Sequence, residues 1–270
     1  MAKKPRKQKE LYTNRSSLIV YLVLRALVIL ALVLSVLRRD YESVFLCGLT
    51  LILFLLPLVV EKHFKIRLPG TLEIIILLFI FAAEILGELS SFYVRVPHWD
   101  TVLHTINGFL CAAIGFALVD MFNRSERFSI QLSPLYLAVV AFCFSMTVGV
   151  VWEFFEYGCD LLLGLDMQKD TIIHTLNTVE LDMTRTNQVI SVADIADVTL
   201  TLADGSAQSL SLGGYLDMGL HDTMKDLLVN FIGAVVFSVI GFFFVKSRGK
   251  NKFARRFIPE VLTKDDSPEK

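Results

Sequence analysis

The feature that most constrains this chain is a series of six apolar stretches, each long enough to cross a lipid bilayer. A spanning helix needs roughly 20 mainly apolar residues, because the hydrocarbon core of a bilayer is about 30 Å thick. The stretches cover about Ser17–Leu37, Tyr41–Val60, Thr71–Leu89, Thr101–Phe122, Pro134–Glu156 and Asp222–Val245. A mean hydropathy of +0.59 excludes an ordinary soluble domain. We therefore predict an all-α polytopic membrane protein with six transmembrane helices.

The distribution of Lys and Arg predicts the orientation. If the N-terminus is cytoplasmic, 19 of the 26 Lys and Arg residues fall on the cytoplasmic side and six on the outer side. Cytoplasmic segments of membrane proteins carry such an excess. We expect a multi-pass protein of the cell (plasma or inner) membrane with both termini inside. Its parts are a basic leader (1–16), five helices (17–164), an external loop (165–221), a sixth helix (222–245) and a charged tail (246–270), ordered only over 253–261 at the membrane surface.

The external loop contains two short runs in which apolar and polar residues alternate. One covers Val198–Leu202 and the other Gln208–Leu212, and Asp204-Gly205 lies between them. An Asp-Gly pair between alternating runs is typical of a β-hairpin. We therefore predict a small external β-hairpin inserted in an otherwise helical protein.

Ionisable and amide side chains gather where the last four predicted helices meet the outer surface. They are Glu84 and Glu88, then Asp100, His104 and Asn107, then Glu153, Glu156 and Asp160, and finally Asp222, Asp226 and Asn230. Most neighbours within each set are three or four residues apart, so each set lies on one face of its helix. Glycines in the same helices, such as Gly108 and Gly233, predict close helix packing.

Two interpretations of these residues stay open. Asp100 and Asp222 stand at helix N-termini, where capping of free backbone N–H groups explains an Asp without any function. His104, Asp226 and Asn230 lie one to two turns further in. Ionisable groups within a membrane span are usually paired, face the helix bundle and serve a function. The second group is therefore the stronger indication of a site.

A divalent metal would suit this constellation. Glu153 and Glu156 lie at a helix C-terminus, where the helix dipole disfavours negative charge, so we expect His104, Lys225 or a bound cation to balance them. Carboxylates with one imidazole are typical ligands of magnesium, manganese or iron. The candidate metal ligands are Asp100, His104, Glu153, Glu156, Asp222 and Asp226. A buried structural network of acids is the alternative, because no compact metal motif occurs.

Several other chemistries lack support in the sequence. The four cysteines have no C-x-x-C spacing and lie in or beside apolar stretches, so we expect no disulfide. Only His104 lies well inside a predicted helix, which argues against a bis-histidine haem. No phosphate-binding glycine loop predicts a nucleotide site. A net charge of −1 gives no reason to expect a nucleic-acid partner, so membrane lipids are the expected partners.

Three ordered motifs resemble a known family. They are His98-Trp-Asp-Thr-Val-Leu-His104 with Asn107-Gly-Phe109, then Gly149-x-x-Trp-Glu-Phe-x-Glu-Tyr-x-x-Asp160, and then Gly214-Tyr-Leu-Asp217 followed by His221-Asp-Thr-x-x-Asp-Leu-x-x-Asn-x-x-Gly-Ala234. Together they resemble the YjdF-type bacterial inner-membrane proteins over about half of the chain. The helix-opening Asp and His and the last Asp and Asn are more distantly similar to VanZ-like membrane proteins. Neither resemblance implies a particular reaction.

Our leading hypothesis is an enzyme-like site at the outer leaflet that acts on a lipid headgroup or a lipid-linked cell-envelope precursor. In it, His104, Glu153 and Asp226 are the catalytic candidates, and Asn230, Asn107 and Lys225 are the substrate-binding candidates. One alternative is an ion- or proton-coupled transporter, in which the acids relay cations. A second is a non-catalytic scaffold or stress-response protein, in which the acids are structural and the hairpin binds a partner.

Overall fold

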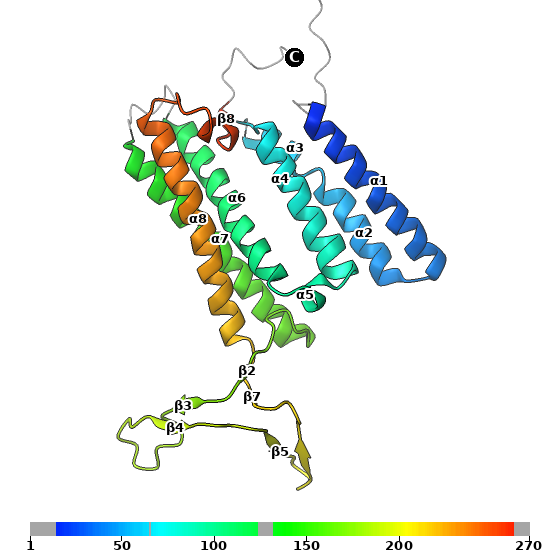
Figure 1. Cartoon of the computed structure of the whole chain (residues 1–270), viewed down its shortest axis with the longest axis vertical. Helices are drawn as coiled ribbons and strands as arrows, with labels where there is room; N and C mark the ends of the chain where they lie inside the picture. The colour runs from blue at the N-terminus through cyan, green and yellow to red at the C-terminus, as the bar shows by residue number, and fades with distance from the viewer. Residues whose placement is uncertain (1–14, 65, 124–131, 262–270) are drawn as a thin grey trace, which may run out of the picture. The chain divides into compact units, whose positions relative to one another are not determined.

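A computed structural model of the chain describes residues 15–64, 66–123 and 132–261 (Figure 1). Five helices in the described residues are long and apolar enough to cross a membrane. They are α1 (Arg15–Arg38), the stretch Tyr41–His63 formed by α2 (Tyr41–Leu53) and α3 (Leu56–Phe64), α6 (Trp99–Asn123), α7 (Pro134–Leu163) and α8 (Leu220–Lys246). Residues 1–14 of the predicted leader, and the tail beyond residue 261, lie outside the described residues.

Two of the predicted spans are interrupted. The break between α2 and α3 falls at Phe54 and Leu55, just before Pro57, which cannot donate a backbone hydrogen bond and whose ring disrupts a helix interior. The predicted span Thr71–Leu89 consists of α4 (Gly70–Phe81) followed directly by a wider π-helical segment, η1 (Ala82–Leu89). Neither part alone has the length of a span, so a sixth membrane crossing stays a prediction.

The chain divides into two compact units, whose boundaries fall within α7 and α8. The first comprises residues 1–149 and 227–270, and the second comprises residues 150–226. A short helix, α5 (Phe92–Arg95), precedes α6 in the first unit.

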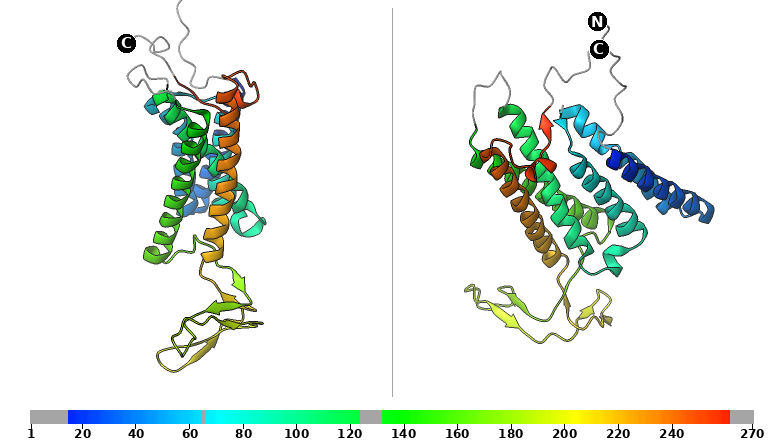
Figure 2. Two further views of the ribbon diagram at one scale, coloured as in Figure 1. Left: turned by 90° about the vertical axis from the view of Figure 1, so that its left-hand side faces the viewer. Right: turned by 45° about the horizontal axis from the view of Figure 1, so that its top comes forward.

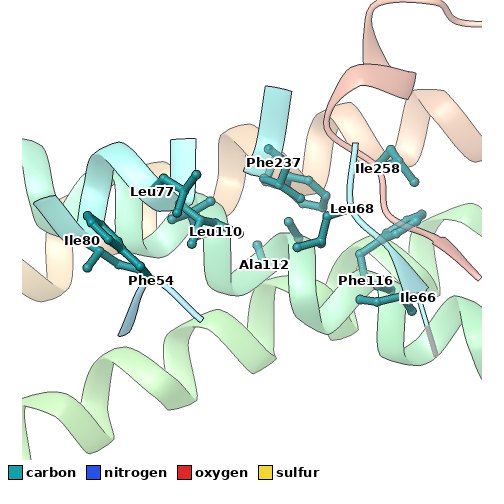
Figure 3. Close-up of a cluster of buried hydrophobic side chains, with 14 of the residues drawn as sticks. Phe54, Ile66, Leu68, Leu77, Ile80, Leu110, Ala112, Phe116, Phe237 and Ile258 are labelled. Carbon is teal, nitrogen blue, oxygen red and sulfur yellow. The ribbon is translucent and has the colours of Figure 1, made fainter. Parts of the chain in front are cut away.

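A continuous apolar core holds the first unit together (Figure 3). The residues that contribute to it are almost completely buried: Phe54 between α2 and α3, Leu77 of α4, Leu110 and Phe116 of α6, and Phe237 of α8. Burial of each large apolar side chain contributes roughly 1.5–3 kcal/mol to folding in water. Between helices in lipid, however, close packing has to supply the stability. The core therefore fixes which faces of α6 and α8 meet.

Glycines bring α6 into backbone contact with α8, as the sequence predicted. A Cβ atom on Gly108 would lie 2.1 Å from the carbonyl oxygen of Asn230, and one on Gly233 would lie 2.0 Å from that of Thr105. No larger residue fits at either position without moving a backbone. This contact holds the beginning of α6 in register with α8 and so positions the polar residues there.

Part of the predicted tail folds back onto the first unit. After α8, Arg248 adopts a positive φ of 54° and the amides of Arg248 and Gly249 bond to Val245 and Phe244, a common helix-ending turn. A short 3₁₀ segment, η2 (Ala254–Arg256), leads to Ile258, which is 2% exposed in the core. Strand β8 (Glu260–Val261) then pairs antiparallel with β1 (Ile66–Arg67). Residues 253–261 are thus packed against the first unit, and their predicted place at the membrane surface stays a prediction.

The second unit contains the ends of α7 and α8 that border the long loop, together with the loop itself. Three antiparallel strand pairs form in the loop (yellow-green in Figure 2). They are β2 (Ile172–Ile173) with β7 (Tyr215–Leu216), β3 (Leu176–Thr178) with β4 (Ile190–Val192), and β5 (Thr199–Thr201) with β6 (Ala207–Ser209). Strand β5 lies within the first alternating run, β6 overlaps the start of the second, and Gly205 between them has a φ of +83°. Each strand is only two or three residues long.

Candidate metal centre

Asp100 and His104 form a pair on the first turns of α6. The Oδ1 atom of Asp100 lies 3.4 Å from Nε2 of His104, and their side chains are 26% and 12% exposed. The helix period places them on one face, because residues four apart are neighbours. Their separation is at the outer limit of a hydrogen bond or close ion pair. It is close to the roughly 3 Å between two adjacent ligands of an octahedral ion that binds each at about 2.1 Å.

Asp226 supplies a third donor from α8. It is 1% exposed and lies one turn before Asn230 in the same unbroken helix. One ligand atom each from Asp100, His104 and Asp226 lies within 4.8 Å of the other two. The chain therefore carries a possible metal-binding group of two carboxylates and one imidazole. These donors suit magnesium, manganese or iron.

Asn230 lies in a contact between helices, and its predicted role in orienting a substrate stays a prediction. Its Nδ2 atom donates to the carbonyl oxygen of Ser145 at 3.5 Å, and its Oδ1 atom accepts from Nδ2 of Asn107 at 3.4 Å. The hydroxyl of Ser145 donates in turn to the carbonyl oxygen of Gly108 at 2.7 Å. These bonds link α6, α7 and α8 within the first unit. Both predicted substrate-binding amides are thus part of a contact between helices.

Asp222 and Lys225 lie near the start of α8 in the second unit. One carboxylate oxygen of Asp222 accepts from the backbone N–H of Lys169 at 2.9 Å, and the other accepts from Nζ of Lys225 at 2.7 Å. Lys225 also lies 3.8 Å from Asp226. Asp222 therefore ties the long loop (165–221) to α8, while Asp217 accepts the backbone N–H of His221 at the start of that helix. The predicted role of Asp222 as a metal ligand stays a prediction.

The acids of α7 differ from one another. Glu153 and Glu156 are 5% and 8% exposed, and Glu156 accepts from the indole N–H of Trp152 at 2.8 Å. Asp160 accepts backbone N–H groups of Met167 and Gln168 at 2.6 and 2.9 Å, so its charge is balanced by the following loop. Both glutamates are buried in the second unit, and their roles as ligands or acid–base groups stay predictions.

Two donors beside Asp100 were missed by sequence reasoning. The indole N–H of Trp99 and the hydroxyl of Thr101 are buried and have no hydrogen-bond partner in the part of the chain that the structure describes. A buried polar group without a partner costs roughly 1–3 kcal/mol. From the sequence alone, Trp99 is expected to be an aromatic residue at the membrane interface, and Thr101 an ordinary helix residue. Only their burial marks them as donors available to a ligand.

One carboxylate in the external loop is held entirely by its sequence neighbours. Asp182 accepts hydrogen bonds from the hydroxyl and the backbone N–H of Thr184 at 2.5 and 2.9 Å. It also accepts the backbone N–H groups of Thr186 and Gln188. The bond from the Thr184 hydroxyl, with the backbone donors of Gln188, Thr184 and Thr186, lowers the pKa of Asp182 to about 2. Asp182 is thus a structural anchor of the loop.

Comparison with known proteins supports the membrane assignment. A Thermotoga maritima protein described as "Uncharacterized protein" is 25% identical over 107 residues, which cover 40% of this chain and 53% of the relative. The match thus spans about half the length of that relative. No solved structure matches the chain. Residues 20–247 match a family described as "Predicted membrane protein (DUF2238)". Because that match covers most of the sequence and includes all or most of each of the five long apolar helices, the chain belongs to this family of membrane proteins.

Proposed function

We propose that Asp100, His104 and Asp226 bind a divalent cation, and that the resulting centre acts on a phosphate-bearing lipid headgroup or lipid-linked envelope precursor at the outer leaflet. The observation that carries the proposal is the approach of the three ligand atoms to within 4.8 Å. A bound cation would relieve the cost of placing two carboxylates beside an imidazole in a low-dielectric surrounding.

The depth of these residues supports a headgroup substrate. Asp100 is the second residue of α6, and Asp226 lies in the second turn of α8. His104 follows the start of α6 by five residues, about 8 Å along the helix axis. A site at this depth meets the boundary between headgroups and hydrocarbon, because a spanning helix places its ends there. The Lys and Arg distribution supports the outer leaflet as its side of the membrane.

Other residues take the remaining roles in this proposal. A bound cation would polarise a phosphoryl oxygen and neutralise its charge. The Trp99 indole and the Thr101 hydroxyl flank Asp100 and are suited to donate to phosphate oxygens. Glu153 is the candidate acid–base group, and Lys225 the candidate cation for the substrate's negative charge. In this proposal Asn107 and Asn230 hold α6 against α8, so they position the ligands and do not contact the substrate.

Elemental analysis of detergent-purified protein tests the metal centre. We expect about one Mg, Mn or Fe per wild-type chain, and loss of that metal in the His104→Ala and Asp226→Asn variants. The matched controls are His221→Ala and Asp204→Asn, which change the same residue types at exposed positions in the second unit. Equal metal content in all five proteins, or none in the wild type, would show that the three residues do not form a metal centre.

Lipid chemistry tests the second half of the proposal. Membranes that contain wild-type protein or the same variants are compared by mass spectrometry of total lipids and lipid-linked precursors. We expect a lipid species to accumulate when His104 or Asp226 is changed, and not when His221 or Asp204 is changed. A metal that is present and lost as predicted, with lipid profiles identical throughout, would leave a metal site without the proposed substrate.

A further inference from the structure

An apolar groove lies between α7 and α8 within the first unit, far along α8 from the candidate metal centre. Its volume is about 340 Å³, and the surface that lines it is entirely apolar. Leu135, Val139 and Phe142 line it from α7, and Ser238, Val239 and Phe242 line it from α8. Val139 and Val239 are 48% and 47% exposed, so the groove opens onto the face that meets the hydrocarbon of the bilayer. An apolar lining suits a hydrocarbon chain.

A lysine stands at the end of this groove. The Nζ atom of Lys246 lies 5.6 Å from the centre of the Phe242 ring, and Phe242 is one of the lining residues. Lys246 is the last residue of α8 and is exposed. The groove therefore leads from hydrocarbon to a positive charge at the membrane surface. A phospholipid has the same order of parts, an acyl chain followed by a phosphate.

The residues that follow Lys246 reinforce this charge. The stretch 246–256 contains six basic residues, Lys246, Arg248, Lys250, Lys252, Arg255 and Arg256, and no acidic residue. Each of the six is exposed, whereas Ala254 and Ile258 are buried in the first unit. The basic side chains are thus carried on a folded segment beside the membrane. Basic clusters directly after a membrane helix attract anionic lipids.

We propose that the α7–α8 groove and the Lys246 end of α8 together bind one anionic phospholipid, with an acyl chain in the groove and the phosphate beside Lys246. The charge of the 246–256 segment selects an anionic headgroup over a zwitterionic one. This lipid differs from the substrate proposed above, because Asp226 and Lys246 are 20 residues apart on one helix, about 30 Å along its axis. The inference does not depend on the metal centre.

Native mass spectrometry of the full chain in detergent tests the proposal, with phosphatidylglycerol as the anionic probe and phosphatidylcholine as the zwitterionic one. We expect one phosphatidylglycerol to be retained by the wild type in preference to phosphatidylcholine. Val239→Trp fills the groove and should abolish this retention. Val236→Trp is the matched control, because Val236 is 48% exposed on α8 and does not line the groove.

Lys246→Ala tests the headgroup contact. Its affinity for phosphatidylglycerol should fall about fivefold, as expected for one cation beside an anionic lipid, with phosphatidylcholine binding unchanged. Lys62→Ala, which removes an exposed lysine from α3, should have no effect. Thermal unfolding of each variant establishes that it is folded.

Three results would overturn the proposal. One is equal phosphatidylglycerol retention by Val239→Trp and Val236→Trp in folded protein. Another is a wild type that retains the two lipids equally. The third is a change of oligomeric state in Val239→Trp without a change in retained lipid, which would assign the groove to a second copy of the chain.

Discussion

The pair α6 and α8 and the pair formed by α1 and the α2–α3 stretch are all apolar enough to span a membrane, yet they differ in burial and in some of their polar contacts. The most apolar window of α6 is 50% buried inside the protein, and that of α1 is 22% buried. Asn230 of α8 bonds to Asn107 of α6 and to Ser145 of α7, so its amide connects three helices. In α2, Thr50 bonds to the carbonyl oxygen of its own helix at Leu46. Helices of similar hydropathy therefore have two roles. Some mainly face lipid, and others position the polar residues of the candidate site.

The largest predicted effect comes from glycines. Gly233→Val should prevent α8 from packing on α6, because the new Cβ would lie 2.0 Å from a backbone oxygen. Overpacking of a core typically costs 1–3 kcal/mol, and a clash with backbone should cost at least about 3 kcal/mol. Gly48→Val in α2 is the control, since no atom lies within 4 Å of a Cβ there. Thermal unfolding in detergent measures both, and equal stabilities would show that the two pairs of helices do not differ as described.

An intermediate effect is expected from the hydrogen bonds between helices. Ser145→Ala leaves the carbonyl oxygen of Gly108 without its 2.7 Å donor and should lower stability by roughly 0.6–1.7 kcal/mol, the range found for such bonds in membrane proteins. Thr50→Val removes a hydroxyl that bonds within its own helix, so its cost should be smaller. Denaturant unfolding of the two variants compares them. A Thr50→Val cost equal to or above that of Ser145→Ala would contradict the distinction between local and long-range bonds.

This distinction also explains what the sequence could predict. Hydropathy located the five long apolar helices, and glycine positions predicted the close approach of α6 and α8. The spacing of Asp100 and His104 followed from the helix period, but their approach to Asp226 depends on how helices far apart in sequence meet. We expected Asn230 to orient a substrate. Nothing in the sequence shows that Ser145 lies beside it. Contacts over more than 80 residues have no local pattern.

The tail is a second region whose contacts could not be predicted from the sequence. Its basic residues predicted a charged and mostly disordered segment, with only 253–261 at the membrane surface. Ile258 nevertheless packs into the core, and β8 pairs with β1 nearly 200 residues earlier. A two-residue strand carries no recognisable periodicity. The pairing becomes visible only when both partners are placed in space.

A third prediction concerns the metal and tests whether α6 and α8 form a framework for a site. If the wild type binds a cation at Asp100, His104 and Asp226, removal of the metal by a chelator should lower its melting temperature, because a ligand that binds only the folded state stabilises it. The chelator should not change the melting temperature of His104→Ala. A metal present at 100 times its Kd contributes about 2.7 kcal/mol. If the chelator lowered the melting temperature of both proteins equally, the stabilising metal would not be bound by His104.

The smallest effect is expected at Asp182 in the long loop (165–221), where the hydrogen-bond partners are closest in sequence. All of its hydrogen-bond donors lie within six residues, and they lower its pKa to about 2 from the ordinary value of 3.8. A lowered carboxyl pKa stabilises the folded loop at pH values above the ordinary pKa, and this contribution is lost as the pH falls from about 4 through about 2. The protection of the 182–188 amides, measured as hydrogen exchange relative to the intrinsic rate at each pH, should therefore fall over that pH range in the wild type. In Asp182→Ala these amides should have little protection at any pH, while the protection of the α6 and α8 amides stays unchanged in both proteins. A loss of protection that spreads to α6 would mean that the loop is coupled to the helices, which would contradict the contrast between local and long-range hydrogen bonds.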